Sequence, residues 1–224
     1  MFPALTFAPE VQGRIRVAWI AADPVEVGAT GAELLAELER TREELRARHA
    51  GQAPADVPGL QPARELYRRF GIDPTKTRPS SEALFRRLVA GKPWPRVSSA
   101  VDLCNLLAVR FLLPIGLYDA RKIGGAVTLR RGAAGESYPG IRKDAVHLAG
   151  RPVLADEGGP FGNPTADSWR ACIDAATAAL WMVVFAPPEF PREQLERHGA
   201  EAAAAIARHL GGRPGLSTRS GALG

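Results

Sequence analysis

The chain has 224 residues, of which 46% are hydrophobic and 24% are charged, a composition typical of a folded domain with a core of its own. Its longest apolar run, residues 175–188, is interrupted by Thr177 and is too short to cross a bilayer. The N-terminus lacks the basic and apolar regions of a secretion signal. We therefore expect a cytoplasmic protein without membrane association, in which Cys104 and Cys172 are reduced core residues.

The net charge of +5 is unevenly distributed, because residues 62–96 contain nine Lys or Arg side chains against three acidic ones. A polyanion such as a nucleic-acid backbone would bind this segment, and a solvated arginine-rich helix face is the alternative interpretation. The side chains expected to contact nucleic acid are Arg64, Arg68, Arg69, Lys76, Arg78, Arg86 and Arg87.

The first part of the chain predicts one strand and one helix. Residues 14–21 alternate apolar and polar side chains, as a strand does. Thr30 and Glu33 have the spacing of a capping box, and the helix that they begin is predicted to run to about Ala47. The Pro, Gly and Ala content of residues 50–61 predicts a loop. Residues 1–61 are thus expected to be a strand–helix extension packed on a main domain of residues 62–210.

Two short amphipathic helices are predicted next, one beginning at Pro62 and one that follows Pro79 and stops at Gly91. A longer helix, capped by Ser99 and predicted over residues 100–113, is apolar nearly all round, as expected of a buried helix.

Asn105 lies on this buried helix, on the same face as Asp102. A polar side chain in such a place must find partners, or it costs on the order of 1–3 kcal/mol. Asn105 is therefore expected either to fasten a loop through a backbone hydrogen bond or to face a pocket.

Beyond Pro114 the pattern changes to short strands and glycine turns, predicted over residues 115–119, 125–130, 145–148 and 152–155. The continuous apolar run of residues 178–185 favours a buried strand, and a last helix follows Pro191. Residues 211–224 are predicted to be a flexible tail. Helices at both ends of a strand-rich middle predict an α+β fold with a mixed sheet and packed helices.

Several familiar chemistries have no motif here. The four histidines are scattered, and none has metal-ligand spacing to Cys, Asp or Glu. Lys122-Ile123-Gly124-Gly125 has the wrong order for a phosphate loop, and there is neither a Gly-x-Ser-x-Gly elbow nor a dinucleotide fingerprint. The sequence therefore predicts no metal and no cofactor.

A family resemblance rests on ordered motifs in the middle of the chain. Thr77-Arg78-Pro79-Ser80-Ser81-Glu82 comes first, Asp102-x-x-Asn105 second, and Pro114-x-x-x-Tyr118-Asp119-x-x-Lys122-Ile123-x-Gly125 third. Val127-Thr128-Leu129-Arg130-Arg131 and Leu154-Ala155-Asp156 follow. Together, over roughly residues 67–187, they resemble the B3/B4 domain, the tRNA-editing module of the phenylalanyl-tRNA synthetase beta subunit, and in particular its stand-alone versions.

The resemblance implies hydrolysis of the ester that joins a wrong amino acid to tRNA. An aminoacyl ester is already activated, so a positioned water and donors to the oxyanion can suffice without a nucleophile. The expected partner is the aminoacylated 3′ end of tRNA, with no readout of DNA sequence. The chain is too short for an aminoacylation module and carries no ATP motif, so it cannot charge tRNA alone.

Two departures from the synthetase pattern leave alternatives open. Synthetase versions often carry a histidine where this chain has Gly116, and residues 159–168 lack the glutamate of their glycine-rich loop. The leading hypothesis is a freestanding domain that clears mischarged tRNA. The second is a non-catalytic module that binds RNA, an amino acid or a nucleotide, and a weaker third is a general small-molecule hydrolase.

The candidate site residues lie in the matching motifs and in the polar loop after residue 162. Those expected to take part in catalysis are Asn105, Thr165, Asp167 and Ser168. Those expected to bind substrate are Tyr118, Asp119, Asn163 and Arg170. Ordinary turn chemistry is the alternative for the loop, since Asn-Pro and Asp-Ser are common turn formers. Asp156 is expected to anchor the glycine turn that follows it.

Overall fold

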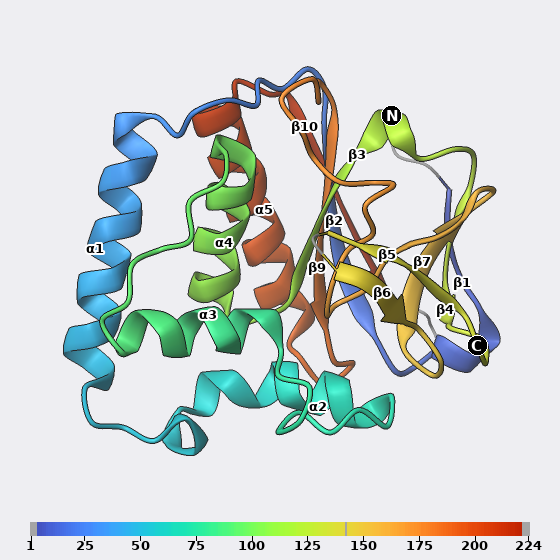
Figure 1. The fold of residues 1–224 in the computed structure, drawn as a ribbon, viewed down its shortest axis with the longest axis horizontal. Helices are drawn as coiled ribbons and strands as arrows, with labels where there is room; N and C mark the ends of the chain where they lie inside the picture. Colours follow the sequence, from blue (N-terminus) through green and yellow to red (C-terminus); the bar gives the residue numbers. More distant parts are fainter. Residues whose placement is uncertain (1–3, 142, 221–224) are drawn as a thin grey trace.

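A computed structural model describes residues 4–141 and 143–220 of the chain, which form a layer of helices and two β-sheets (Figure 1). The helices are α1 (Ala32–His49), α2 (Gln61–Arg69), α3 (Ser80–Val89), α4 (Ser99–Phe111) and α5 (Arg192–Leu210). Short 3-10 turns are η1 (Pro9–Val11), η2 (Pro54–Asp56), η3 (Pro58–Leu60) and η4 (Ala120–Lys122).

The first sheet has the strand order β10-β2-β9-β3, and all its neighbours are antiparallel. Its strands are β2 (Arg16–Ala22), β3 (Ile115–Asp119), β9 (Leu180–Ala186) and β10 (Pro214–Ser220).

The second sheet has the order β1-β4-β7-β8, in which β1 runs parallel to β4 and the other neighbours are antiparallel. Its strands are β1 (Leu5–Phe7), β4 (Val127–Arg131), β7 (Pro152–Asp156) and β8 (Gly159–Gly162). A separate hairpin joins β5 (Ser137–Gly140) to β6 (Lys143–His147). The α+β class with a mixed sheet is confirmed.

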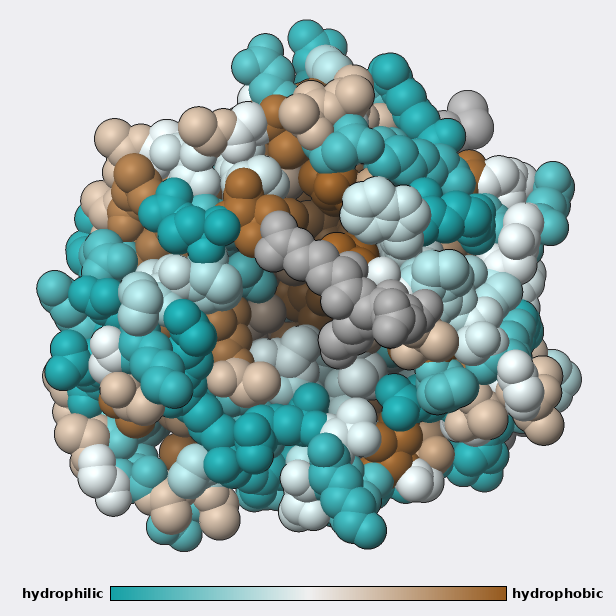
Figure 2. Space-filling model, in the orientation of Figure 1, coloured by the Kyte–Doolittle hydropathy of each residue, from teal (hydrophilic) through white to brown (hydrophobic). Residues whose placement is uncertain are grey.

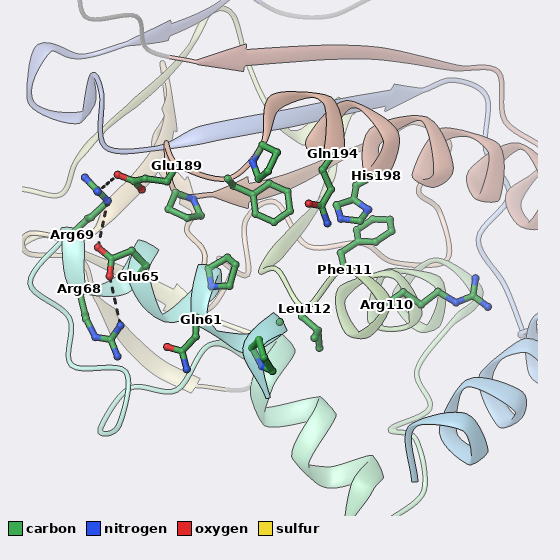
Figure 3. A pocket seen from close by; sticks show the side chains of 16 residues that line it. Gln61, Glu65, Arg68, Arg69, Arg110, Phe111, Leu112, Glu189, Gln194 and His198 are labelled. Atoms are coloured by element: carbon green, nitrogen blue, oxygen red, sulfur yellow. Dashed lines mark hydrogen bonds and ion pairs between the residues drawn. The ribbon is translucent and has the colours of Figure 1, made fainter. Parts of the chain in front are cut away.

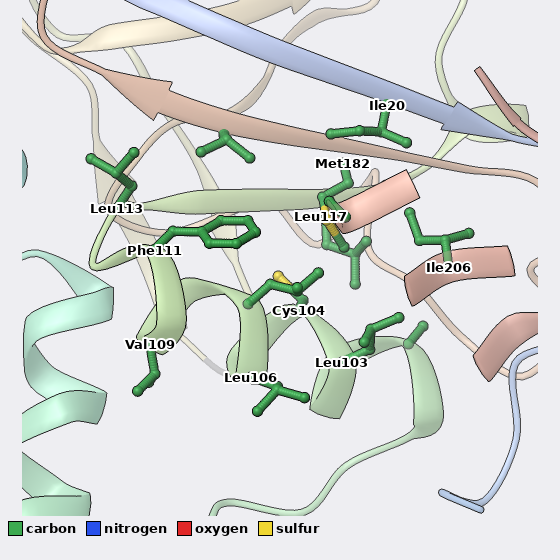
Figure 4. Close-up of a cluster of buried hydrophobic side chains, with 14 of the residues drawn as sticks. Ile20, Leu103, Cys104, Leu106, Val109, Phe111, Leu113, Leu117, Met182 and Ile206 are labelled. Carbon is green, nitrogen blue, oxygen red and sulfur yellow. The ribbon is translucent and has the colours of Figure 1, made fainter. Parts of the chain in front are cut away.

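Strand β9 is buried over its whole length, which explains its continuous apolar sequence. On one face, Met182 packs with Ile20 of β2 and with side chains of α4 and α5 in the cluster shown in Figure 4. On the other face, Trp181 and Val183 pack between the two sheets, and Trp181 meets Trp19 edge to face at 5.1 Å. The first sheet is therefore covered on both faces, by helices and by the second sheet.

The start of α4 differs from the prediction. Its N-cap is Ser98, whose Oγ accepts a hydrogen bond from the backbone N–H of Val101 at 3.4 Å, and Ser99 is the first helical residue. The Asp102 carboxylate is buried and accepts hydrogen bonds from Thr30 Oγ1 at 2.7 Å and from Arg96 Nε at 2.6 Å. The capping box predicted at Thr30 is therefore wrong, because its hydroxyl binds Asp102 and α1 begins without a side-chain cap.

One further prediction needs correction, and the structure adds elements that the sequence did not predict. The flexible-tail prediction fails for residues 214–220, since they form β10 and pair with β2 along its whole length; residues 221–224 lie outside the described part of the chain. Residues 50–61 contain η2 and η3 within the predicted loop. Strands β1, β5 and β8 were not predicted.

Residues before position 62 contribute an interior strand to the main sheet, because β2 lies between β9 and β10. Among residues 4–141 and 143–220, no helix is both long and apolar enough to span a membrane.

Tyr118 is the tightest point of the packing between the sheets. Its side chain is fully buried and meets the Phe161 ring edge to face at 5.1 Å. Gly116 and Gly162 both lie so close to the tyrosine ring that a Cβ atom on either would overlap it. Both positions therefore require glycine for reasons of space rather than backbone conformation.

We expect Gly162→Ala to destabilise the protein by about 1–3 kcal/mol, because the added methyl group forces Tyr118 out of its position in a close-packed core. Gly124→Ala is the matched control, since nothing lies within 4 Å of the added atom there. Urea unfolding of both variants measures the difference. Equal free energies of unfolding would contradict this account of the packing.

Candidate functional site

A cavity of about 700 Å³ opens between α3, α4 and the strand β3. In the space-filling view, the surface is hollowed near its centre, and mainly apolar residues line the hollow (Figure 2). The apolar lining comprises Leu84, Val97, Val101, Cys104, Ala108, Ile115, Leu117, Ile141, Trp169, Cys172 and Ile173. A cavity of this size, apolar with a few polar groups, is typical of a small-molecule site.

Asn105 faces this cavity from α4. Its side-chain amide forms no hydrogen bond with any residue in the described ranges, although most residues of its helix are buried. Of the two alternatives that the sequence left open, the structure thus shows the pocket and not the backbone bond. The amide is available for a ligand.

Asp167 is the second polar group of the cavity. Its Oδ2 accepts a hydrogen bond from the Leu117 N–H at 3.4 Å, and its buried Oδ1 has no hydrogen bond of normal geometry among the described residues, although the Tyr118 hydroxyl lies beside the carboxyl. Burial raises the pKa of this carboxyl to about 7, and the Tyr118 hydroxyl and the Leu117 amide offset only part of that rise. A carboxyl group that changes charge near neutral pH in a cavity is typical of functional sites.

Three of the loop residues predicted for the site form hydrogen bonds that fasten the loop. Asn163 Oδ1 accepts hydrogen bonds from the Thr165 and Ala166 N–H groups, at 2.7 and 3.0 Å. Thr165 Oγ1 donates to the Tyr67 hydroxyl at 3.1 Å, and Ser168 Oγ accepts from the Ala171 N–H at 3.4 Å. None of the three lines the cavity, so the structure groups only Asp167 of this loop with Asn105.

Two tyrosines that sequence reasoning missed fasten the same loop. The Tyr67 hydroxyl donates to the Pro164 carbonyl at 2.9 Å, and the Tyr138 hydroxyl donates to the Ala166 carbonyl at 2.5 Å. Asn163 Nδ2 donates to Tyr138 Oη at 2.7 Å. Burial raises the pKa of Tyr67 to about 12, so its hydroxyl stays protonated and can donate. These bonds hold Asp167 in place from α2 and β5.

Tyr118 and Asp119 do not line the cavity. Tyr118 belongs to the core between the sheets, so it cannot stack on a ligand there. Asp119 accepts hydrogen bonds from the Arg121 N–H at 3.0 Å and from Thr177 Oγ1 at 2.8 Å, with Lys122 Nζ 3.7 Å away. Asp119 thus fixes the turn that follows β3.

Arg170 and Lys122 line the cavity, but both cations are already paired. Arg170 makes two hydrogen bonds to the Asp156 carboxylate, at 2.8 and 3.0 Å. Lys122 Nζ lies 2.6 Å from Asp174 Oδ2. Asp156 also accepts from the N–H groups of Gly124 and Gly158, both at 2.9 Å, which confirms its predicted role as an anchor of the glycine turn.

The positive charge of the basic segment, residues 62–96, is neutralised by ion pairs that its sequence does not reveal. Buried Glu82 binds Arg64 with two hydrogen bonds, at 2.7 and 2.8 Å, and also pairs with Arg86 at 2.9 Å and with Arg78 at 3.8 Å. Burial raises the pKa of Glu82, but the two arginines Arg64 and Arg86 outweigh it and hold the pKa below its usual range.

Of the other predicted nucleic-acid contacts, Arg68 and Arg69 each lie 3.6 Å from Glu65, and Arg69 also pairs with Glu189. Arg87 Nε donates to the Pro93 carbonyl at 2.7 Å. The Lys76 side chain forms no ion pair or hydrogen bond within the described residues. The structure does not bring the seven cations into one free cluster.

Sequence reasoning missed the rim of the cavity. Val97, Ile141 and Trp169 are large apolar side chains that line it and yet are exposed, by 58%, 40% and 61%. Only the position of Trp169 after the polar loop could have signalled this from the sequence. Exposed apolar groups around a cavity mark a contact surface.

A second cavity, of about 850 Å³, lies between α2, the end of α4 and the start of α5 (Figure 3). There the His198 ring stacks on Phe111 at 4.1 Å, and burial lowers the pKa of His198. The charged side chains at one end of it, Glu65, Arg69 and Glu189, pair with one another, as the dashed lines show. Its charged residues Glu65, Arg69 and Glu189 are ion-paired, whereas Asp167 of the first cavity forms no ion pair within the described residues, so the first cavity is the better candidate site.

The fold is an α+β domain with a mixed sheet, and its candidate site is the cavity lined by Asn105 and Asp167. The sequence model of the B3/4 domain matches residues 62–208, and the chain belongs to that family.

The structure is similar to the crystal structure of an N-terminal fragment of the phenylalanyl-tRNA synthetase beta-subunit from Pyrococcus horikoshii, with a TM-score of 0.51 and 11% sequence identity. The match covers 96% of this chain and 53% of that one, so the chain spans about half the length of the fragment. At this identity the likeness shows a common fold. No curated protein is similar enough in sequence to match.

The raised pKa of Asp167 predicts how stability depends on pH. Between its unfolded value of about 3.9 and its folded value of about 7, the native state holds a proton that the unfolded chain has released. The free energy of unfolding should therefore fall as pH rises through this window and level off above it. Asp167→Asn should remove that part of the fall.

Thermal unfolding of both forms at about pH 5 and about pH 8 measures the effect. Glu157→Gln is the matched control, because it removes a carboxylate that is exposed to solvent. Parallel pH curves for the wild type and Asp167→Asn would show that the carboxyl titrates normally.

Proposed function

We propose that this chain is a freestanding, cytoplasmic tRNA-binding domain that hydrolyses mischarged aminoacyl-tRNA. The observation that carries the proposal is the apolar cavity lined by the Asn105 amide and the Asp167 carboxyl, in a member of the B3/4 family. In this proposal residues 62–210 carry the site, and residues 1–61 extend the fold around it.

The chemistry needs little from the protein. The aminoacyl ester is activated, so holding it beside a water in a cavity that excludes other water lowers the barrier. In this proposal the Asn105 amide, which lines the cavity, donates a hydrogen bond to the ester carbonyl oxygen, on which negative charge develops. Asp167 fixes the aminoacyl group. Thr165 Oγ1 donates to the Tyr67 hydroxyl of α2 and Ser168 Oγ accepts from the Ala171 N–H, so no serine or threonine nucleophile is invoked.

The cavity rim supplies a surface for the RNA end. Trp169 presents an exposed ring at the mouth, and an unpaired base can stack on such a ring. The basic segment of residues 62–96 would contact the backbone through its least neutralised cations, of which Lys76 is one.

A second candidate function is a non-catalytic module that binds RNA, an amino acid or a nucleotide through the same cavity. It is favoured by Gly116, the position at which synthetase versions often carry a histidine. The Tyr118 ring occupies the space that any side chain at Gly116 would need. Binding without turnover would identify this function.

A panel of mischarged tRNAs tests the proposal. We expect deacylation of at least one, and we expect Asn105→Ala and Asp167→Ala each to slow it by about tenfold or more, since each removes a hydrogen-bonding group from the cavity. Glu157→Gln should keep the wild-type rate. Absence of any deacylation, together with ligand-induced thermal stabilisation, would favour the binding module. Equal rates in all variants would place the reaction elsewhere.

Trp169→Ala should weaken binding of a short single-stranded RNA with a free 3′ end by about fivefold to a hundredfold, whereas Trp169→Phe should retain most of the affinity. Fluorescence anisotropy of a labelled oligonucleotide at low salt measures both. Unchanged RNA binding by Trp169→Ala would show that no base stacks on the Trp169 ring.

A further inference from the structure

We infer that a third cavity, at one end of the first sheet, binds a phosphate group through Arg121 and Arg213, and that this phosphate belongs to the RNA backbone that leads to the candidate site. The inference rests on the proposed function for the identity of the RNA. It adds phosphate contacts on a surface outside the basic segment of residues 62–96.

The third cavity has a volume of about 310 Å³ and arises from small side chains on the face of the first sheet that is turned toward the second. In the register of the first sheet, Gly215 of β10 lies beside Ala21 of β2, and Ala21 lies beside Trp181 of β9. Because side chains that face each other across two strands are about 5 Å apart, the glycine and the alanine leave a depression next to the indole ring. The other lining residues are Ala22, Asp23, Ala120, Arg121, Ala179 and Arg213.

Two short connections that are fixed by the sheet carry the arginines. Arg121 lies in η4, directly after β3, and its backbone N–H donates to the Asp119 carboxylate at 3.0 Å. Arg213 directly precedes Pro214, the first residue of β10. Both arginine side chains are exposed and line the cavity, so a ligand can reach them from solvent.

The charges of the lining favour an anion. Neither the Arg121 nor the Arg213 guanidinium forms an ion pair or a hydrogen bond within residues 4–141 and 143–220. Asp23 is the acidic residue of the lining, so two cations and one carboxylate leave an excess of one positive charge. Guanidinium groups bind phosphate oxygens through paired, charge-assisted hydrogen bonds, which makes a phosphate the fitting ligand.

The contrast with the basic segment strengthens this assignment. There, Arg64 and Arg86 bind the buried Glu82 carboxylate. A phosphate in that place would have to separate arginines from a buried carboxylate, which is costly. At the third cavity a phosphate meets two guanidinium groups that are free of carboxylates in the described part of the chain, so binding breaks no ion pair there.

The third cavity adjoins the candidate site through η4. Lys122 lines the candidate site, and Arg121, its neighbour in the chain, lines the third cavity. Consecutive Cα atoms are about 3.8 Å apart, so the two cavities lie on either side of one short turn. An RNA strand whose 3′ end enters the candidate site can therefore place one of its preceding phosphates against Arg121 and Arg213.

The salt dependence of binding to a short single-stranded RNA with a free 3′ end tests the inference. Arg121→Ala and Arg213→Ala should each weaken binding by about threefold to tenfold at low salt, and each should reduce the slope of log affinity against log salt by about 0.7, the share of one phosphate contact. Asp23→Asn should instead tighten binding by about twofold, because it removes a carboxylate that repels the phosphate. Fluorescence anisotropy measures all three variants.

Arg197→Ala is the matched control. Arg197 is also exposed and unpaired within the described ranges, and at 1.5 Å per residue it lies about 20 Å along α5 from the helix end that precedes Arg213. This variant should keep the wild-type slope. Unchanged slopes in both Arg121→Ala and Arg213→Ala, an equal reduction in Arg197→Ala, or weaker binding by Asp23→Asn would overturn the inference.

Inorganic phosphate, as a second probe, separates the RNA backbone from a small anion. Loss of phosphate binding in the two arginine variants, with RNA binding unchanged, would overturn the assignment to RNA. If those variants bind RNA as the wild type does while mischarged tRNA is still deacylated, the inference fails and the proposed function stands. If RNA binding depends on both arginines but no mischarged tRNA is deacylated, the proposed hydrolysis fails and the phosphate site stands.

Discussion

The burial of β9 on both faces is the constraint on which the rest of the structure depends. A strand with no polar side chain from Leu180 to Ala186 needs neighbours on both edges and a cover on both faces. Strands β2 and β3 supply the edges, the helices cover one face, and the second sheet covers the other. The cavity lies beside this core, between α3, α4 and β3.

The site combines a rigid wall with a fastened loop. Buried α4 carries Asn105, and the start of the helix is tied to two other segments through Asp102. The loop that carries Asp167 is bound to α2 and β5 by Tyr67 and Tyr138. These bonds hold Asn105 and Asp167 in fixed positions on the wall of the cavity.

Local patterns predicted the elements that are strongly apolar, such as β9 and α4, and they predicted that Asn105 had to find a partner or a pocket. They missed β10, because its Gly and polar residues are typical of a flexible tail and its strand structure depends on pairing with the distant β2. They placed the whole polar loop in the site, although only the three-dimensional positions of two distant tyrosines distinguish Asp167 from Asn163. The pairing of Arg64 with Glu82 across two helices was equally hidden from local sequence.

The placement of Tyr118 against Gly116 and Gly162 limits how this protein can diverge. A single substitution at either glycine collides with the ring, and loss of the ring alone leaves a void between the sheets. A lineage that gained a histidine at position 116 would have to replace the tyrosine first or at the same time. Substitutions at the three positions should therefore occur together in evolution, because a change at one of them is tolerated only when the other two change to fit it.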